Sequence, residues 1–230
     1  MLNRQQCPLQ DIVSLMPPRP PAAERLDRGE LLSTALAIAD ADGLDAVTLR
    51  RVAAGWNVTP MALYWHFKDK DALLDALVER ILGEMDLTAQ GKPDLPTVMA
   101  ALLRVLRAHP ALAEITPLRF MRTDAGIDLA ERVIGLLRAE GHSPVAAAQL
   151  SIFLLNALIG LVIRQPGETA VADPALRESL LTAKRARLKS LSPQDYPQLT
   201  ETADFFLGLP DEQEYYERGL TMLLDGVRLT

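Results

Sequence analysis

The chain has 230 residues, of which 49% are apolar and 5% are aromatic, and its formal net charge is −6. This length and apolar content are sufficient for one or two domains with a buried core. The single cysteine, Cys7, excludes an internal disulfide and a metal site made of several cysteines, and it is compatible with a reducing compartment.

Residues 1–25 are rich in proline, which predicts a disordered leader. The leader lacks the positive start, apolar centre and small-residue cleavage site of a secretion signal, so we expect a cytoplasmic protein. Leucine and alanine dominate the rest of the chain and no long β-branched run occurs, which favours an all-α fold.

The first expected helix runs from about Arg28 to Ala41. Apolar residues recur at helical spacing between Leu32 and Ala39, and Gly43 is a natural stop after them.

Two short helices are expected next, on either side of a tight turn at residues 56–58. Thr48 is a good N-cap for the first helix, and Thr59-Pro60 supplies a hydroxyl cap followed by proline for the second. Asn57 lies in the turn, where a left-handed backbone conformation is useful and asparagine tolerates it. The second helix is expected to span Thr59–Lys68.

The whole segment from Ala46 to Lys68 contains no acidic residue, although acids outnumber bases in the chain by 30 to 24. A helix-turn-helix requires this arrangement, because its second helix lies against phosphates.

A fourth helix, capped by Asp69 or Asp71, is expected to continue to about Met85. Glycine and proline then interrupt the segment from Thr88 to Pro96, the best position for a domain boundary. The sequence therefore predicts a DNA-binding domain over 26–86, with the fourth helix as connector, and a helical domain over 93–230. Helices are expected there at Leu95–Ala108, Asp124–Ala139, Pro144–Arg164, Pro174–Leu191 and Asp211–Arg228.

The N-terminal third closely resembles the TetR (tetracycline-repressor) family of bacterial one-component regulators. The matching segments are Thr48 to Ala53, the run Leu63-Tyr64-Trp65-His66-Phe67-Lys68, and Lys70 to Leu77. A weaker match covers Tyr216 to Gly226, which is similar to the last helix of a tetracycline-repressor-type C-terminal domain.

This resemblance implies a homodimer with paired DNA-binding heads and a helical body that binds a small molecule and releases DNA. It implies that Arg50 reads a base in the major groove and that Thr59 opens the recognition helix. Base-edge or thymine-methyl contacts are implied for Pro60, Met61 and Tyr64, and phosphate contacts or a supporting role for Thr48, Trp65, His66 and Lys70. Considered without the resemblance, Arg50 could be a solvated charge and Tyr64 a core aromatic residue.

The run from Val145 to Ile163 has no charged residue, so a membrane span is an alternative. Gln149 and Asn156 interrupt the run, which favours a helix covered by its own domain on one side and by a partner on another. The last helix offers a second apolar stripe from Leu220 to Val227. As the resemblance suggests, helices 144–164 and 211–228 would form a four-helix dimer interface, and no membrane contact is expected.

Several residues lie on helices expected to surround an effector pocket, although plain core packing is an equal alternative for them: Met85, Met99, Leu103, Leu106, His109, Phe120, Phe153, Asn156 and Ile163. His109 matches a ligand-side histidine of tetracycline repressors, whose further partners hold a magnesium-chelated drug. Asp86 and Arg164 occupy those places here, and an arginine repels a divalent ion. We therefore expect no metal, no other cofactor and no tetracycline at this pocket. Asn156 could orient a mostly apolar ligand there.

The sequence thus predicts a ligand-responsive repressor that binds a palindromic operator as a dimer and is released by a small, largely apolar effector. A ligand-independent regulator or an activator of the same fold is the alternative. Alternatives of another class are a helical small-molecule-binding or membrane-associated protein, and a scaffold that uses the second short helix for protein contacts. No glycine-rich phosphate loop, G-x-S-x-G motif or metal-spaced histidine set is present, so no enzyme is expected.

Overall fold

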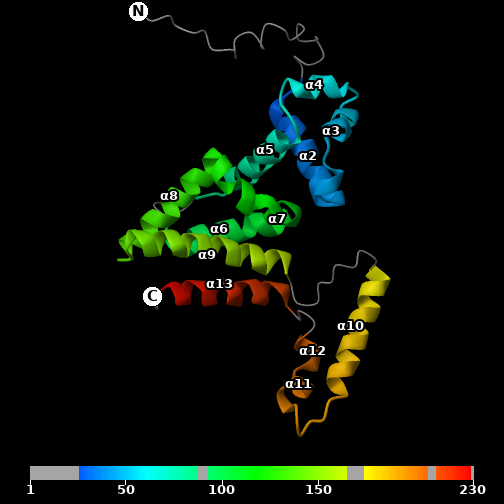
Figure 1. The fold of residues 1–230 in the computed structure, drawn as a ribbon, viewed down its shortest axis with the longest axis vertical. Helices are drawn as coiled ribbons and strands as arrows, with labels where there is room; N and C mark the ends of the chain where they lie inside the picture. Colours follow the sequence, from blue (N-terminus) through cyan, green and yellow to red (C-terminus); the bar gives the residue numbers. More distant parts are fainter. Residues whose placement is uncertain (1–25, 88–92, 165–173, 207–210, 229–230) are drawn as a thin grey trace, which may run out of the picture. The chain divides into compact units, whose positions relative to one another are not determined.

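The computed structural model describes residues 26–87, 93–164, 174–206 and 211–228, so the expected leader lies outside the described residues. Every regular element in these ranges is a helix, which confirms the all-α prediction. The chain divides into two compact units, with the division between Leu77 and Val78. The helices of the first unit are α2 (Arg28–Asp42), the 3₁₀ turn η2 (Leu44–Ala46), α3 (Leu49–Gly55), α4 (Pro60–Tyr64) and the start of α5 (Lys70–Gly83) (Figure 1).

Helix α2 forms where the sequence predicts it. The Asp27 side chain accepts a hydrogen bond from the backbone N–H of Glu30 at 3.0 Å and caps the first turn. Gly43 ends the helix with φ +79°, a conformation that suits glycine. The expected apolar stripe is buried, from Leu32 to Ala39.

Helices α3 and α4 pack against each other as a helix-turn-helix. Thr48 caps α3 by accepting from the backbone N–H of Arg51 at 3.1 Å, and Asn57 has φ 53° in the turn, so both predictions are confirmed. Pro60 begins α4, but the side chain of Thr59 makes no capping hydrogen bond, contrary to expectation.

Helix α4 is shorter than expected: it ends at Tyr64 rather than at Lys68. The backbone N–H groups of His66 and Phe67 both donate to the Leu63 carbonyl at 2.9 Å, which tightens the chain into a turn. This turn carries the Phe67 ring into the core, where it is 1% exposed. Burial of a large ring therefore ends the helix.

Helix α5 belongs to both units. Asp69 caps it by accepting from the backbone N–H of Ala72 at 2.8 Å. Leu73 and Leu77 are fully buried within the first unit, whereas Val78 and Leu82 belong to the core cluster of the second. One uninterrupted helix therefore contributes side chains to two cores.

The second unit has several helices that pack around α6, and the three short or outlying helices before the last one pack against one another. Its elements are α6 (Leu95–Ala108), α7 (Pro110–Arg119), the 3₁₀ turn η3 (Phe120–Arg122), α8 (Asp124–Ala139), α9 (Pro144–Ile163), α10 (Pro174–Lys189), α11 (Pro197–Glu201), α12 (Ala203–Phe206) and α13 (Glu212–Arg228). The bounds of α6 and α8 agree with those expected, and α9, α10 and α13 differ by one or two residues. The sequence reading missed α7, α11 and α12, because they are short and α7 contains Pro117 in its interior.

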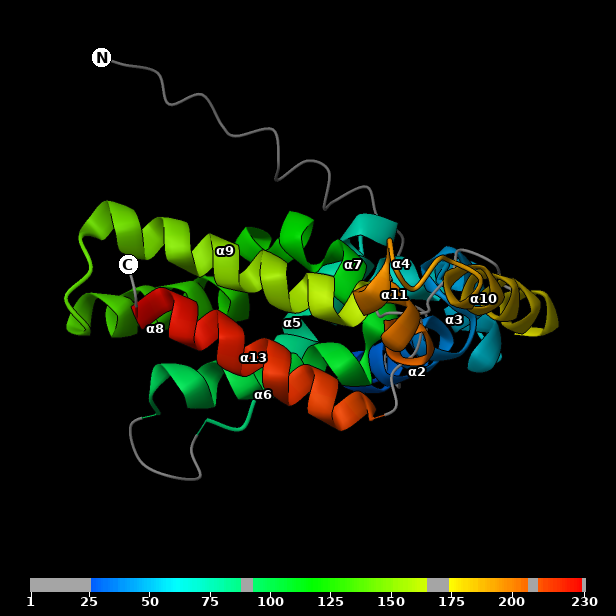
Figure 2. The ribbon, with the colours of Figure 1, turned by 90° about the horizontal axis from the view of Figure 1, so that it is seen from below.

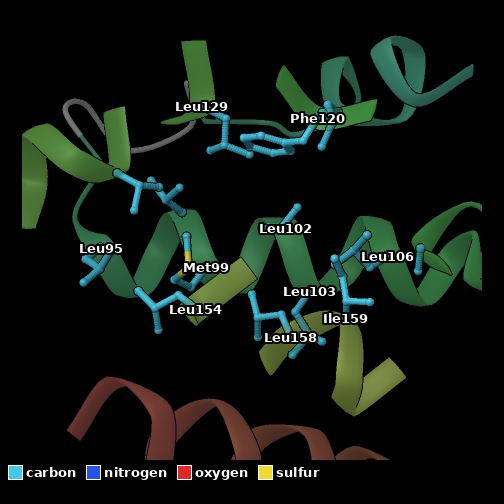
Figure 3. Close-up of a cluster of buried hydrophobic side chains, with 14 of the residues drawn as sticks. Leu95, Met99, Leu102, Leu103, Leu106, Phe120, Leu129, Leu154, Leu158 and Ile159 are labelled. Atoms are coloured by element: carbon cyan, nitrogen blue, oxygen red, sulfur yellow. The ribbon is translucent and has the colours of Figure 1, made fainter. Parts of the chain in front are cut away.

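Helix α6 is the centre of this core. Figure 3 shows Phe120 and Leu129 on one side of α6, and Leu154 and Leu158 of α9 on the other. Helix α13 lies beside α9 in both ribbon views (Figures 1 and 2). Gly219 allows this approach, since a Cβ atom there would lie 2.9 Å from a methyl carbon of Leu161.

Candidate nucleic-acid interface and effector cavity

Helix α4 exposes large apolar side chains on one face. Met61 is 62% exposed and Tyr64 is 46% exposed, whereas Ala62 and Leu63 on the opposite face are buried. Thr59 and Pro60 at the start of the helix are exposed as well. A helix that keeps one apolar face open beside its own core presents that face for contact with another molecule.

Two adjacent arginines of α3 have different surroundings. Arg51 forms an ion pair with Asp42 at the end of α2. Arg50 is exposed, and its guanidinium has no ion-pair partner within the residues that the structure describes. Arg50 can therefore form new bidentate hydrogen bonds without losing existing ones.

The four residues expected to hold phosphates differ in their freedom. Thr48 is exposed, and its hydroxyl, which accepts a bond from Arg51, keeps its donor. Trp65 and His66 are half-buried at the end of α4. The Lys70 ammonium donates to the Leu44 carbonyl at 3.2 Å, so it braces η2 with one of its three donors.

The sequence reading missed one cation of this unit. The Arg28 guanidinium lies 5.1 Å from the centre of the Phe67 ring. Lys68, the next residue in the chain after Phe67, is exposed. Because Arg28 and Phe67 lie 39 positions apart in the chain, no periodic spacing in the sequence could have placed them together.

The second unit contains a cavity of about 350 Å³. Residues of α6, α7, η3, α8 and α9 line it, and none of them is charged. They are Met99, Leu102, Pro117, Phe120, Met121, Leu129, Ala130, Val133, Ile134, Ala148, Ser151, Ile152, Leu155 and Asn156.

Three of the residues expected at the pocket, namely Met99, Phe120 and Asn156, line this cavity. Leu103 and Leu106 do not line the cavity and belong to the buried core cluster instead. Phe153 is 56% exposed, since it follows the cavity-lining Ile152 by one residue and points elsewhere.

The remaining expected residues lie beside the core or at a helix junction. Met85 and Ile163 are partly buried against the core cluster. His109 lies between α6 and α7, and its Nε2 atom is 3.3 Å from a carboxylate oxygen of Glu84. In the structure His109 is therefore engaged with an acid rather than with the cavity.

Most of the cavity wall was not anticipated. Helix α8 supplies residues from Leu129 to Ile134 at spacings of three and four, a pattern visible in the sequence. Pro117 and Met121 lie on α7 and η3, elements that the sequence reading did not define.

Among the described residues, no group of three or more histidines, cysteines or acids could hold a metal ion. Helix α9 is, within those residues, the one helix long and apolar enough to cross a membrane by length and composition. Core helices of soluble proteins meet the same criterion. Only 28% of the most apolar stretch of α9 is buried in the single chain. Much of its apolar surface is therefore available to contact another molecule.

Comparison with known proteins gives the family. Residues 31–77 match the family described as "Bacterial regulatory proteins, tetR family", and residues 92–230 match "Tetracyclin repressor-like, C-terminal domain". The chain belongs to the TetR family. It is thus a transcriptional regulator with an N-terminal DNA-binding domain and a C-terminal ligand-binding domain, and regulators of this family act as dimers.

This TetR regulator has relatives along most of its length. It is 27% identical to an HTH-type transcriptional regulator of Saccharopolyspora erythraea, over 89% of this chain and 86% of the relative. It is 29% identical to the class C tetracycline repressor protein of Escherichia coli, over 88% and 91%.

Solved TetR structures have the same fold. The Streptomyces coelicolor TetR family protein ActR, in complex with (S)-DNPA, superposes with a TM-score of 0.71 at 27% identity, covering 88% of this chain and 96% of ActR. A second ActR structure, in complex with actinorhodin, gives a TM-score of 0.70 at the same identity.

Proposed function

We propose that this regulator is a repressor whose dimer binds a palindromic operator through two copies of α4. The observation that carries this proposal is the exposed apolar face of α4, with Met61 and Tyr64, next to an arginine, Arg50, that has no ion-pair partner among the described residues. Apolar side chains suit thymine methyl groups, and a free guanidinium suits guanine. Thr48, Trp65, His66 and Lys70 would hold phosphates around this contact.

The proposed roles of the two parts of the chain are those predicted from the sequence. Residues 26–86 would bind DNA, and residues 93–230 would bind the effector and the partner subunit. The chain would act in the cytoplasm, where operator DNA lies, without a catalytic role or a cofactor.

The effector proposed for the cavity is small, uncharged and largely apolar. No charged side chain lines the wall, and burying an unpaired charge there would be costly. The Ser151 hydroxyl already donates to the Ala148 carbonyl at 2.8 Å, and the Asn156 amide donates to the Ile152 carbonyl at 3.0 Å. The carbonyl oxygen and the second N–H of Asn156 remain, as does the Ser151 oxygen as an acceptor, so an effector with a hydroxyl group, which both donates and accepts, fits these groups. The ligand complexes of ActR support a small molecule in this domain.

The proposed dimer interface consists of α9 and α13. Exposed apolar residues on α9 include Val145, Ile152 and Phe153, and Met222 on α13 is 70% exposed. Because α9 and α13 lie side by side (Figure 2), a second copy could cover both in one four-helix interface.

Selection of bound fragments from a random DNA pool tests the proposed function. A twofold palindrome with half-sites about one helical turn apart is the expected result. Recovery of random sequences at low salt would contradict it. Loss of the bound DNA when an uncharged apolar compound occupies the cavity would support repression, whereas tighter binding would indicate an activator.

A further inference from the structure

Glu79 of α5 makes a specific contact with the first turn of α8. Its two carboxylate oxygens accept from the backbone N–H of Ala125, at 3.0 and 3.2 Å. The first N–H groups of a helix have no partner within the helix, and the helix dipole favours a negative charge there. Glu79 therefore attaches α5 to the start of α8 by a charge-assisted bond.

The same turn of α8 is attached to the cavity wall. The Thr123 hydroxyl donates to the Phe120 carbonyl at 3.0 Å and accepts from the N–H of Gly126 at 3.2 Å. Gly126 lies so close to η3 that an added Cβ atom would be 1.9 Å from the Phe120 carbonyl oxygen. Phe120 lines the cavity, so the first turn of α8 is bonded and closely packed to a residue of the cavity wall.

The later turns of α8 line the cavity as well, through Leu129, Ala130, Val133 and Ile134. Helix α8 thus lines the cavity with its middle turns and contacts Glu79 at its start. Helix α5 continues without interruption from Glu79 back to Lys70, at the edge of the helix-turn-helix. A rigid helix with one end in each unit can transmit a displacement between them.

We propose that Glu79 is the positioning residue that couples the cavity to the DNA-binding unit, by fixing α5 to the first turn of α8. This inference rests on the proposed function. An occupant that separates the walls of the cavity displaces the start of α8, and the Glu79–Ala125 bond passes that displacement to α5. Without the carboxylate, α5 keeps only its apolar packing through Val78 and Leu82, and a displacement of α8 reaches the DNA-binding unit much less.

A double-mutant cycle on DNA affinity tests this proposal, with a fragment recovered by the random-pool selection as probe. Ala148→Phe places a large side chain in the cavity from the α9 wall, in place of a bound effector. Glu79→Ala removes the hydrogen bond to the Ala125 backbone N–H. Ala148→Phe is expected to change DNA affinity by about tenfold in the presence of Glu79, the usual scale of coupling between sites. In the Glu79→Ala background the same substitution is expected to change affinity by less than about twofold, because independent sites are additive.

Two controls separate coupling from folding. Glu79→Gln keeps an acceptor oxygen for Ala125 and is expected to restore most of the response. Glu131→Ala removes another carboxylate from α8, one that is exposed, and is expected to leave the response unchanged. Thermal unfolding of each variant shows whether the chain is folded under the conditions of the measurement.

The outcomes distinguish the two proposals. Equal effects of Ala148→Phe in both backgrounds, or no effect in either, would overturn the role of Glu79 and leave the regulator intact. Failure of the unmodified chain to prefer any DNA would overturn the proposed function, and the role of Glu79 with it. A response that is lost in Glu79→Ala and recovered in Glu79→Gln would support both.

Discussion

The neighbouring arginines of α3 form a natural pair for experiment. Arg51 is neutralised by Asp42, whereas the Arg50 guanidinium has no such partner in the described part of the chain. The two side chains have the same charge and lie on the same short helix, so a difference between their variants reports on contact with DNA rather than on net charge.

Arg50→Ala is expected to relax sequence preference at one position of each half-site, by about 1–3 kcal/mol, because the bidentate contact to guanine is lost. Arg51→Ala is expected to weaken binding to all sequences by a small and similar factor. Affinities for a panel of single-base operator variants measure both effects. Uniform weakening by Arg50→Ala would show that this arginine contacts only phosphate.

Two glycines of α8 differ in the space around them, and they predict opposite effects on stability. Gly126→Ala would place a methyl group against the Phe120 carbonyl, where backbone must move, and is expected to destabilise the protein by about 3 kcal/mol. Gly135→Ala has open space and is expected to stabilise the helix by about 1 kcal/mol. Urea unfolding measures both changes. Similar stabilities for the two variants would contradict the close approach of α8 to η3.

At the scale of the element, the cap of α6 makes stability depend on pH. Hydrogen bonds from Thr97, including the backbone bond of 2.9 Å, hold the pKa of the Asp94 carboxyl below its ordinary value. The ionised cap is thus favoured in the folded chain. Its contribution is present above the pKa of the unfolded chain, about 3.9, and is lost as the pH falls through the lower pKa of the folded protein.

Asp94→Ala is therefore expected to cost about 1 kcal/mol of unfolding free energy at neutral pH, and less in acid, where the cap is protonated. Urea unfolding at neutral pH and near pH 3 provides the comparison, with Asp94→Asn as a cap that does not titrate. An Asp94→Ala penalty that is constant between the two conditions would argue against an ionised cap.

The long helices could be predicted from the sequence, because their apolar periodicity and caps act locally. Helices α6 and α9 begin at Leu95 and Pro144, where they are expected, and the side chains of Asp94 and Ser143 cap them. The end of α4 could not be predicted in this way. Continuing the helix would have satisfied local propensity, but burial of Phe67 among residues distant in sequence prevailed.

The cavity was harder to predict than the DNA-binding face. The DNA-binding residues lie within one short segment, so their spacing defines their common face. The cavity wall combines five elements, and only three-dimensional packing shows that Phe153 points away from it while Ile152 points towards it.

At the scale of the whole molecule, α9 stands out because it is a long apolar helix of which only 28% is buried over its most apolar stretch. Phe153→Glu is expected to shift the protein from dimer to monomer, because a carboxylate replaces apolar area in the proposed interface. Leu118→Glu is the control, since Leu118 is 80% exposed on α7 and lies outside the proposed interface.

Sedimentation measures the mass of each variant. A Phe153→Glu protein that remains dimeric would place the interface elsewhere. Partition of the unmodified protein into detergent would favour a membrane cover for α9 over a second copy.

Ile152 and Asn156 line the cavity, and both are exposed on the face of α9 proposed to meet the partner subunit. A designer who wishes to retarget this regulator to a new inducer would thus disturb subunit pairing by altering either of them. The wall formed by α8 offers the safer starting point, since Ala130 and Ile134 line the cavity from a helix outside the proposed interface. A biosensor library restricted to α8 should retain far more assembled, operator-competent members than one of equal size on α9.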